Sequence, residues 1–211
     1  MKKLNKGSWG MGFLMLLFLA SCGTSTRLLN SWIAPENKPQ QYKKVLVIGL
    51  IGPRDRDLRE IIENTMVQSL QAQGINAGSA YVEYGPKAFE ELKEQEALKK
   101  ISDKGYDGAF TIALLDKKKE RYYSPGYVGF APYPFGFWGY YRNMWGRMYQ
   151  PGYYNVSTNY MLEGNFYDLN PDKHIYSAQT RTFDPSSAEM LSTDFSKTVV
   201  ADMMTKGLLR R

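Results

Sequence analysis

Apolar residues between positions 44 and 115 alternate between two spacings. Residues 44–50 (KVLVIGL) are a short, nearly continuous apolar run, which is typical of a strand buried on both faces. After Asp55 or Asp57, either of which can cap a helix, apolar residues recur at helical spacing. These residues are Leu58, Ile61, Ile62, Met66 and Leu70, and Gly74 ends the predicted helix.

The same alternation continues over the next forty residues or so. A second strand is predicted near 76–82, a charged helix over 87–104, and a third, apolar strand over 107–115. A β-α-β-α-β order is the pattern of crossover units on a partly parallel sheet. We therefore expect Val47 and Ile112 to be buried in neighbouring strands.

The C-terminal part predicts two more strands and a helix. Residues 156–169 and 174–183 are β-rich runs separated by the turn residues 170–173, so they should pair as a hairpin. Residues 184–187 then cap a helix over 187–206, with an apolar residue at every fourth position. The predicted fold class is α/β: a single domain over 44–211, with a mixed sheet built from β-α-β-α-β, a β-hairpin and a C-terminal helix.

The N-terminal residues have the order of a signal peptide. Three lysines precede the apolar run 11–20, and that run is too short for a permanent spanning helix. It ends in Leu-Ala-Ser-Cys, which resembles the bacterial lipobox, and by that resemblance 1–21 are removed and Cys22 is acylated. Residues 22–43 are polar with one apolar anchor, Trp32, so they are predicted to be a lipid-anchored tether.

The lipid anchor predicts a location and a first partner, the membrane. No Asp follows Cys22, and no acidic cluster comes after it, so by resemblance to other lipoproteins we expect the outer membrane, facing the periplasm. Removing 1–21 takes away three lysines and lowers the formal net charge from +6 to 24 − 21 = +3. An exported chain with so little excess charge is not expected to bind nucleic acid.

Residues 122–154 hold 14 of the 30 aromatic residues, together with six Gly and four Pro. This composition has no sustained period of a helix or strand, and it predicts a long aromatic Gly/Pro-rich insertion between two strands. A membrane interface, a glycan or a protein partner would each suit such a loop, and an arm packed on its own sheet or left disordered is the alternative. The candidate interaction residues are Tyr127, Phe130, Tyr133, Phe137, Trp138, Tyr140, Tyr141, Arg142, Trp145 and Arg147.

Catalytic motifs are missing from the sequence. One Cys and one His leave no disulfide framework and no His-rich metal centre, and no Gly-x-Ser-x-Gly motif is present. We predict no metal, no cofactor and no enzymatic activity. Gly52 and Arg54 lie at a strand-to-helix turn and form a candidate anion-binding turn, although an ordinary tight turn explains them as well.

The chain resembles a family of uncharacterised envelope lipoproteins of Bacteroidetes-type bacteria. The resemblance follows the order of short segments along the chain: the lipobox cysteine, Trp32, residues 47–50, Arg56 and Glu60, 74–77 with Ser79, 167–169, and 175–180 ahead of 184–186. Where such lipoproteins usually have Trp before the Ser-Ala pair, this chain has Tyr176. By analogy, the fold is similar to the N-terminal domain of the Tol-system propeller protein and to periplasmic domains of curli-secretion lipoproteins.

The resemblance and the anchor lead to two functional hypotheses. The first is a non-enzymatic outer-membrane lipoprotein that binds or scaffolds an envelope component, such as a protein or a glycan, through its aromatic loop. The alternative is a periplasmic ligand-binding module for a glycan or small anion, with Arg54 and its turn or the aromatic loop as the site.

Overall fold

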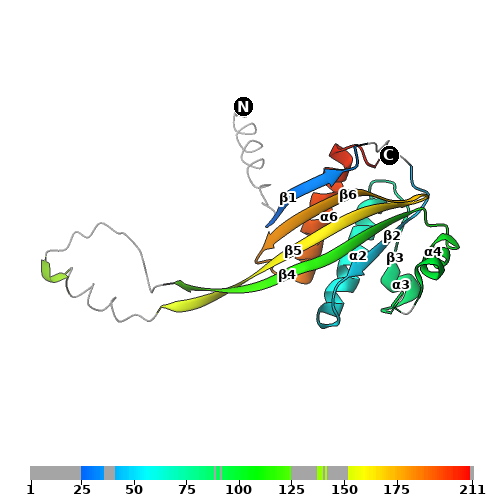
Figure 1. Ribbon diagram of the computed structural model, residues 1–211. Helices are drawn as coiled ribbons and strands as arrows, with labels where there is room; N and C mark the ends of the chain where they lie inside the picture. Colours follow the sequence, from blue (N-terminus) through cyan, green and yellow to red (C-terminus); the bar gives the residue numbers. More distant parts are fainter. Residues whose placement is uncertain are drawn as a thin grey trace, which may run out of the picture.

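The structure is a computed structural model that describes residues 25–35, 41–87, 89–90, 92–124, 137–139, 141 and 152–209. Six strands form one mixed sheet in the order β1-β6-β5-β4-β2-β3 (Figure 1). The strands are β1 (Thr26–Ile33), β2 (Val45–Leu50), β3 (Ala77–Ser79), β4 (Gly108–Ser124), β5 (Tyr153–Leu169) and β6 (Asp172–Phe183). The helices are η2 (Pro53–Asp55), α2 (Arg56–Gln71), α3 (Ala80–Tyr84), α4 (Glu94–Ser102) and α6 (Ala188–Thr205). None of these helices is both long and apolar enough to cross a membrane.

The predicted α/β fold class is confirmed. Strand β2 pairs in parallel with both β3 and β4, as crossover units require, while β4, β5, β6 and β1 pair antiparallel. Val47 and Ile112 are fully buried in the neighbouring strands β2 and β4, as expected. Strands β5 and β6 form the predicted hairpin.

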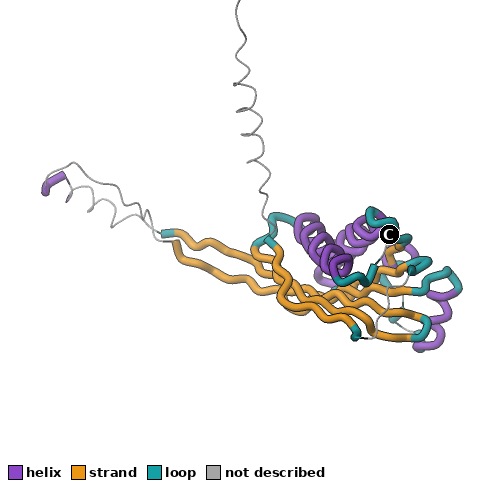
Figure 2. The backbone as a smooth tube through the Cα atoms, turned by 90° about the horizontal axis from the view of Figure 1, so that it is seen from above, coloured by secondary structure: helices purple, strands orange, loops and turns teal. Residues whose placement is uncertain are grey.

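The main core lies between one face of the sheet and the helices α2 and α6, which Figure 2 shows together on that side. Ser187 caps the start of helix α6, and its hydroxyl accepts a hydrogen bond from the Met190 amide. Of the predicted apolar positions of both helices, only Ile61 is half-buried. The others are buried there: Leu58, Ile62, Met66, Leu70, Leu191, Phe195, Val199 and Met203.

Helices α3 and α4 cover only the β2 part of the opposite face. Leu46 of β2 packs there with Ala80, Ile101 and Tyr106 in a second, smaller cluster. Over β4, β5, β6 and β1, no described helix covers this face (Figure 2). We call this uncovered area the open face.

Four predicted elements differ in extent from those of the structure. Residues 26–33, assigned to a tether, form the edge strand β1 because they pair along β6. The second predicted strand is reduced to β3, and the chain turns directly into α3, where the Ser79 side chain accepts from the Val82 amide. The charged helix predicted over 87–104 is α4, which begins at Glu94. Strands β4 and β5 extend into the predicted insertion, to Ser124 and from Tyr153.

Glu83 joins α3 to the sheet and makes stability depend on pH. Its carboxylate accepts from Lys44 Nζ at 3.2 Å, Lys104 Nζ at 3.1 Å and the Tyr106 hydroxyl. Burial alone would raise the pKa of Glu83, but these three hydrogen bonds together hold it below the ordinary value. This stabilisation is complete above the unfolded pKa of about 4.3 and is lost as the pH falls through the lowered folded pKa.

We therefore expect Glu83→Gln to lower the free energy of unfolding by about 1 to 2 kcal/mol at pH 7 and to have little effect at pH 2. Urea titrations of both proteins at the two pH values measure this difference. Glu96→Gln, at an exposed position of α4, is the control and should be neutral at both. A Glu83→Gln penalty that is equal at both pH values would contradict the prediction.

Candidate functional site

A two-stranded extension of the sheet carries a group of exposed aromatic side chains. The register of β4 with β2 ends at Ala113, and the register of β5 with β6 ends at Asn159. Beyond these points, residues 120–124 of β4 pair only with 153–157 of β5, and both strands run out past the sheet (Figure 1). We call this paired segment, 120–124 with 153–157, the arm.

The arm exposes large side chains on both of its faces. The exposed fractions are 52% for Tyr122, 57% for Tyr123, 62% for Tyr153 and 69% for Tyr154. Tyr123 and Tyr154 lie opposite each other, with ring centroids 5.3 Å apart. A two-stranded ribbon has little stability of its own in water, and contiguous exposed apolar surface marks interaction sites.

Charged residues line the base of the arm. Lys118 pairs with Glu120 at 2.9 Å, and the Lys117 ammonium pairs with Asp55 at the end of η2. The hydrogen bond to the Asp55 carboxylate raises the pKa of Lys117. Lysines along the unpaired edge of a strand oppose pairing with a strand of another molecule. The tyrosines lie further out along the arm, so they form its exposed contact surface.

The arm leaves the sheet at the end where the chain enters the domain. Thr26 at the start of β1 pairs with Thr182, and Phe183 at the end of β6 pairs with Asn159, the last β5 residue inside the sheet. Ser25 is held there: its amide donates to the Asp194 carboxylate at 3.2 Å, and its carbonyl accepts from the Phe183 amide at 3.1 Å. These two bonds fix Ser25 against the domain, three positions after Cys22 in the sequence.

Three of the ten predicted interaction residues are described. Phe137, Trp138 and Tyr141 are 72%, 71% and 46% exposed. Their rings contact one another, with centroids 5.5 Å apart for Phe137 and Trp138 and 5.8 Å for Trp138 and Tyr141. The other seven lie outside the described residues: Tyr127, Phe130, Tyr133, Tyr140, Arg142, Trp145 and Arg147. Cys22 also lies outside them.

The candidate anion-binding turn stays a prediction. Gly52 and Arg54 are exposed at the connection from β2 to α2, and Arg54 lines a cavity of about 450 Å³ with Lys117. Asp55 and Asp57 also line this cavity, at the beginning of α2. Their carboxylates already occupy the position where a helix favours negative charge.

The most deeply buried carboxylate, that of Glu63, is saturated with hydrogen bonds. It accepts from the Gly49 amide at 2.7 Å, the Ser79 hydroxyl at 2.6 Å and the Tyr81 amide at 2.7 Å, and Arg59 lies 3.3 Å away. It stands near the carboxyl ends of the parallel strands β2 and β3, where ligand sites of α/β proteins are common. Because its lone pairs are already used, Glu63 joins α2 to two strands rather than binding a ligand.

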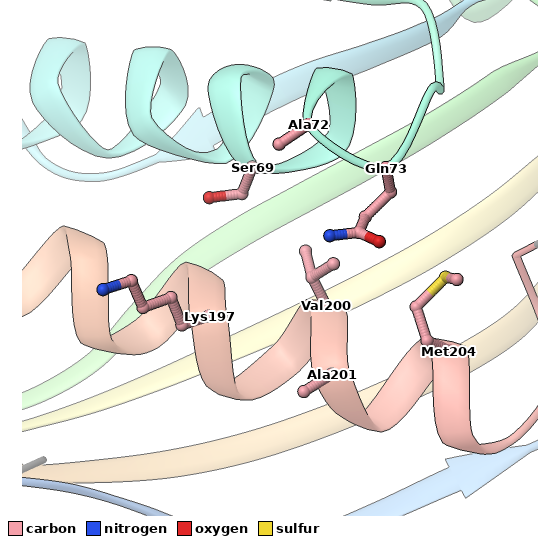
Figure 3. A pocket seen from close by; sticks show the side chains of 7 residues that line it. All are labelled: Ser69, Ala72, Gln73, Lys197, Val200, Ala201 and Met204. Atoms are coloured by element: carbon pink, nitrogen blue, oxygen red, sulfur yellow. The ribbon is translucent and has the colours of Figure 1, made fainter. Parts of the chain in front are cut away.

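Two shallow surface cavities lie beside α6. One, of about 560 Å³, runs between α2 and α6 and is lined by Ser69, Lys197 and Met204 among others (Figure 3). The other, of about 660 Å³, adjoins Ser25 at the beginning of α6. Neither gathers a catalytic set of side chains, and within the described chain no group of His, Cys, Asp and Glu could hold a metal ion.

Sequence reasoning missed a row of aromatic rings on the open face. Trp32 of β1, His174 of β6 and Tyr167 of β5 lie in a row across three strands, with centroids 5.3 Å and 4.9 Å apart and neighbouring rings tilted by 33° and 32°. His174 is exposed on the hairpin strand β6. No local signal could have joined these residues, since the pairing of β1 with β6 was not predicted.

Comparisons with known proteins give structural likeness only. No protein-family model matches the chain, and no curated protein matches it in sequence. Similar solved structures include the PelC dodecamer from Paraburkholderia phytofirmans, with TM-score 0.49, 12% identity and coverage of 88% of this chain and 99% of that one. Lipoprotein GNA1162 from Neisseria meningitidis has TM-score 0.43 and 12% identity, covering 77% of this chain and 98% of that one. A PDZ domain protein from Parabacteroides distasonis has TM-score 0.36 and 9% identity, covering 96% of this chain and 40% of that one.

Proposed function

We propose that this protein is a non-enzymatic lipoprotein of the cell envelope that binds another envelope component through the arm. In this proposal Cys22 carries the lipid in the outer membrane, and the domain faces the periplasm. The observation that carries the proposal is the arm itself: four exposed tyrosines on an unsupported ribbon, which leaves the sheet at the end where Ser25 is held.

The short connection to Cys22 supports a position close to the bilayer. Asp194 and Phe183 hold Ser25, and Cys22 lies three positions before it in the sequence, with only two residues between them. Three extended residues span at most about 10 Å. The acylated domain would therefore stand close to the headgroups, with β1, β6 and the base of the arm on the membrane side.

The length of the arm gives it reach along or away from that surface. Five residue pairs at about 3.3 Å per residue extend about 17 Å beyond the sheet. Tyrosine suits the boundary between lipid and water, and it is also favoured in protein interfaces, because its ring is apolar and its hydroxyl is polar. The arm is thus suited to a component at or near the membrane surface.

The arm can be tested by crosslinking in cells. A photoreactive phenylalanine analogue replaces Tyr154 in the full chain, and a matched one replaces Gln68, an exposed residue of α2. We expect one specific crosslinked envelope component from position 154, identified by mass spectrometry, and none from position 68. Equal crosslinking from both positions would contradict the proposal.

A variant without the arm tyrosines provides the loss-of-binding test. For this test the photoreactive residue is placed at Val156, because Tyr154 is itself replaced. Replacing Tyr122, Tyr123, Tyr153 and Tyr154 with Ser should abolish the crosslink to the envelope component, while the protein stays in the membrane fraction. The thermal midpoint should fall by no more than about 5 °C, because these side chains lie outside the core. A larger fall would assign the tyrosines to folding instead.

A further inference from the structure

We propose that the open face binds a saccharide chain. The site consists of the aromatic row Trp32, His174 and Tyr167 and the adjoining polar side chains Glu163, Asn165 and Gln179. This inference requires neither the lipid at Cys22 nor the arm, so it can fail or hold independently of the function proposed above.

The strand register brings these side chains together. Asn165 of β5 lies opposite Ser177 of β6, which in turn lies opposite Trp32 of β1. In the next row Glu163 lies opposite Gln179, which lies opposite Asn30. Successive rows of one face are two residues apart, so amides and a carboxylate directly adjoin the aromatic row.

The aromatic row supplies the apolar part of a sugar site. Trp32 lies on an edge strand and is 46% exposed, with His174 as its described ring neighbour. A pyranose ring has one face made of C–H groups, and such a face packs on the negatively charged face of an aromatic ring. Trp32 therefore offers a stacking surface at the edge of the sheet.

The polar side chains supply hydrogen bonds that match hydroxyl groups. Glu163 accepts from Asn165 Nδ2 at 3.0 Å and from Gln179 Nε2 at 2.7 Å. These bonds lower the pKa of Glu163, so it is a carboxylate at neutral pH. A carboxylate has about four acceptor sites, and each amide keeps a second N–H and a carbonyl, so this fixed cluster retains both donors and acceptors.

The hydrogen-bonding surface continues along β5 beyond one sugar unit. A cavity of about 210 Å³ lies there, lined by Asp116, Lys118, Glu120, Asn159, Tyr160, Met161 and Arg181. The Asn159 Oδ1 atom is buried and has no hydrogen-bond partner among the described residues. From Tyr167 to Asn159 the strand covers about 26 Å, which is long enough for a chain of several sugars.

Other ligand classes fit this face less well. A protein partner would require an apolar centre, but Glu163, Asn165 and Gln179 occupy the centre of the face. Nucleic acid would require a basic surface, whereas the carboxylates of Asp116, Glu120 and Glu163 offset the charges of Lys118 and Arg181 on this face. A saccharide combines an apolar ring face with many hydroxyl groups, and the open face combines the same two properties.

Binding can be measured with the full-length protein in detergent micelles. Isothermal titration calorimetry would use cellohexaose, chitohexaose and hexagalacturonate as neutral, N-acetylated and acidic probes. We expect at least one of them to bind, and the one that binds identifies the sugar class. Absence of binding to all three at millimolar concentration would overturn the inference.

Variants then locate the site. Trp32→Ala and Gln179→Ala should each weaken binding at least tenfold, with thermal unfolding confirming that each variant is folded. Tyr123→Ala, which removes an exposed aromatic ring from the arm, should bind as the unchanged protein does. Unchanged affinity in both open-face variants, or an equal loss in Tyr123→Ala, would also overturn the inference.

Discussion

Replacing Glu63 with alanine is expected to lower the free energy of unfolding by about 3 to 5 kcal/mol. The substitution removes the acceptor of the buried Gly49 amide, the partly buried Tyr81 amide and the buried Ser79 hydroxyl. Arg59 would also lose its partner. Because natural domains are stable by only about 5 to 15 kcal/mol, a large fraction of the molecules could unfold at physiological temperature.

Urea unfolding of the purified full-length protein measures this loss. Glu60→Ala is the matched control, because Glu60 stands on the same helix and is exposed; it should cost less than about 0.5 kcal/mol. Glu63→Gln should fall between the two, since one amide group would meet donors with an N–H of its own. A loss below about 1 kcal/mol for Glu63→Ala would show that the network does not hold α2 to the sheet.

Replacing Cys22 with serine is expected to transfer the protein from the membrane fraction to the soluble fraction or to leave an unprocessed precursor. The physical reason is the large free energy of membrane binding that is lost with the acyl chains. Each buried methylene contributes about 0.8 kcal/mol, and two or three acyl chains carry dozens of methylenes. Cell fractionation and detergent phase partitioning measure the change, with Ser25→Ala as a control that keeps the cysteine. Full membrane retention of Cys22→Ser would contradict the lipid anchor.

The variant without the arm tyrosines and Cys22→Ser test the two parts of the proposed function separately: binding through the arm and anchoring through the lipid. Loss of the lipid should remove the protein from the membrane whether or not the arm is intact. Loss of the arm tyrosines should leave the protein in the membrane but without its crosslinked component. Together, the two variants distinguish a domain that is only anchored in the membrane from one that also binds an envelope component through the arm.

Elements with strong periodicity were predictable from the sequence. The apolar runs 45–50 and 108–114 lie in the centre of the sheet, where most of their residues are buried, and the fourfold spacing in α2 and α6 follows from the single face that each helix buries. The hairpin of β5 and β6 was predictable because its strands and turn are adjacent in sequence. In each case the signal is local, since burial of one face sets the spacing of apolar residues.

The tertiary structure alone decided the elements with weak local patterns. Strand β1 reads as a polar tether, and it forms because residues about 150 positions away offer it an open strand edge. The helix predicted from Lys87 is described only from Glu94, and β4 extends past its apolar run because β5 pairs with it.

The candidate sites depend on the same long-range pairing. Trp32 meets His174 only because β1 pairs with β6, and Ser25 meets Asp194 only because α6 packs at the start of β1. The sequence by itself determined the buried positions of the two main helices, the burial of Val47 and Ile112, the lipobox match and the aromatic content of 122–154. Only the tertiary structure decided that the arm leaves the sheet at the end where Ser25 is held and that the open face collects its rings and amides, because strand register joins residues that no local pattern relates.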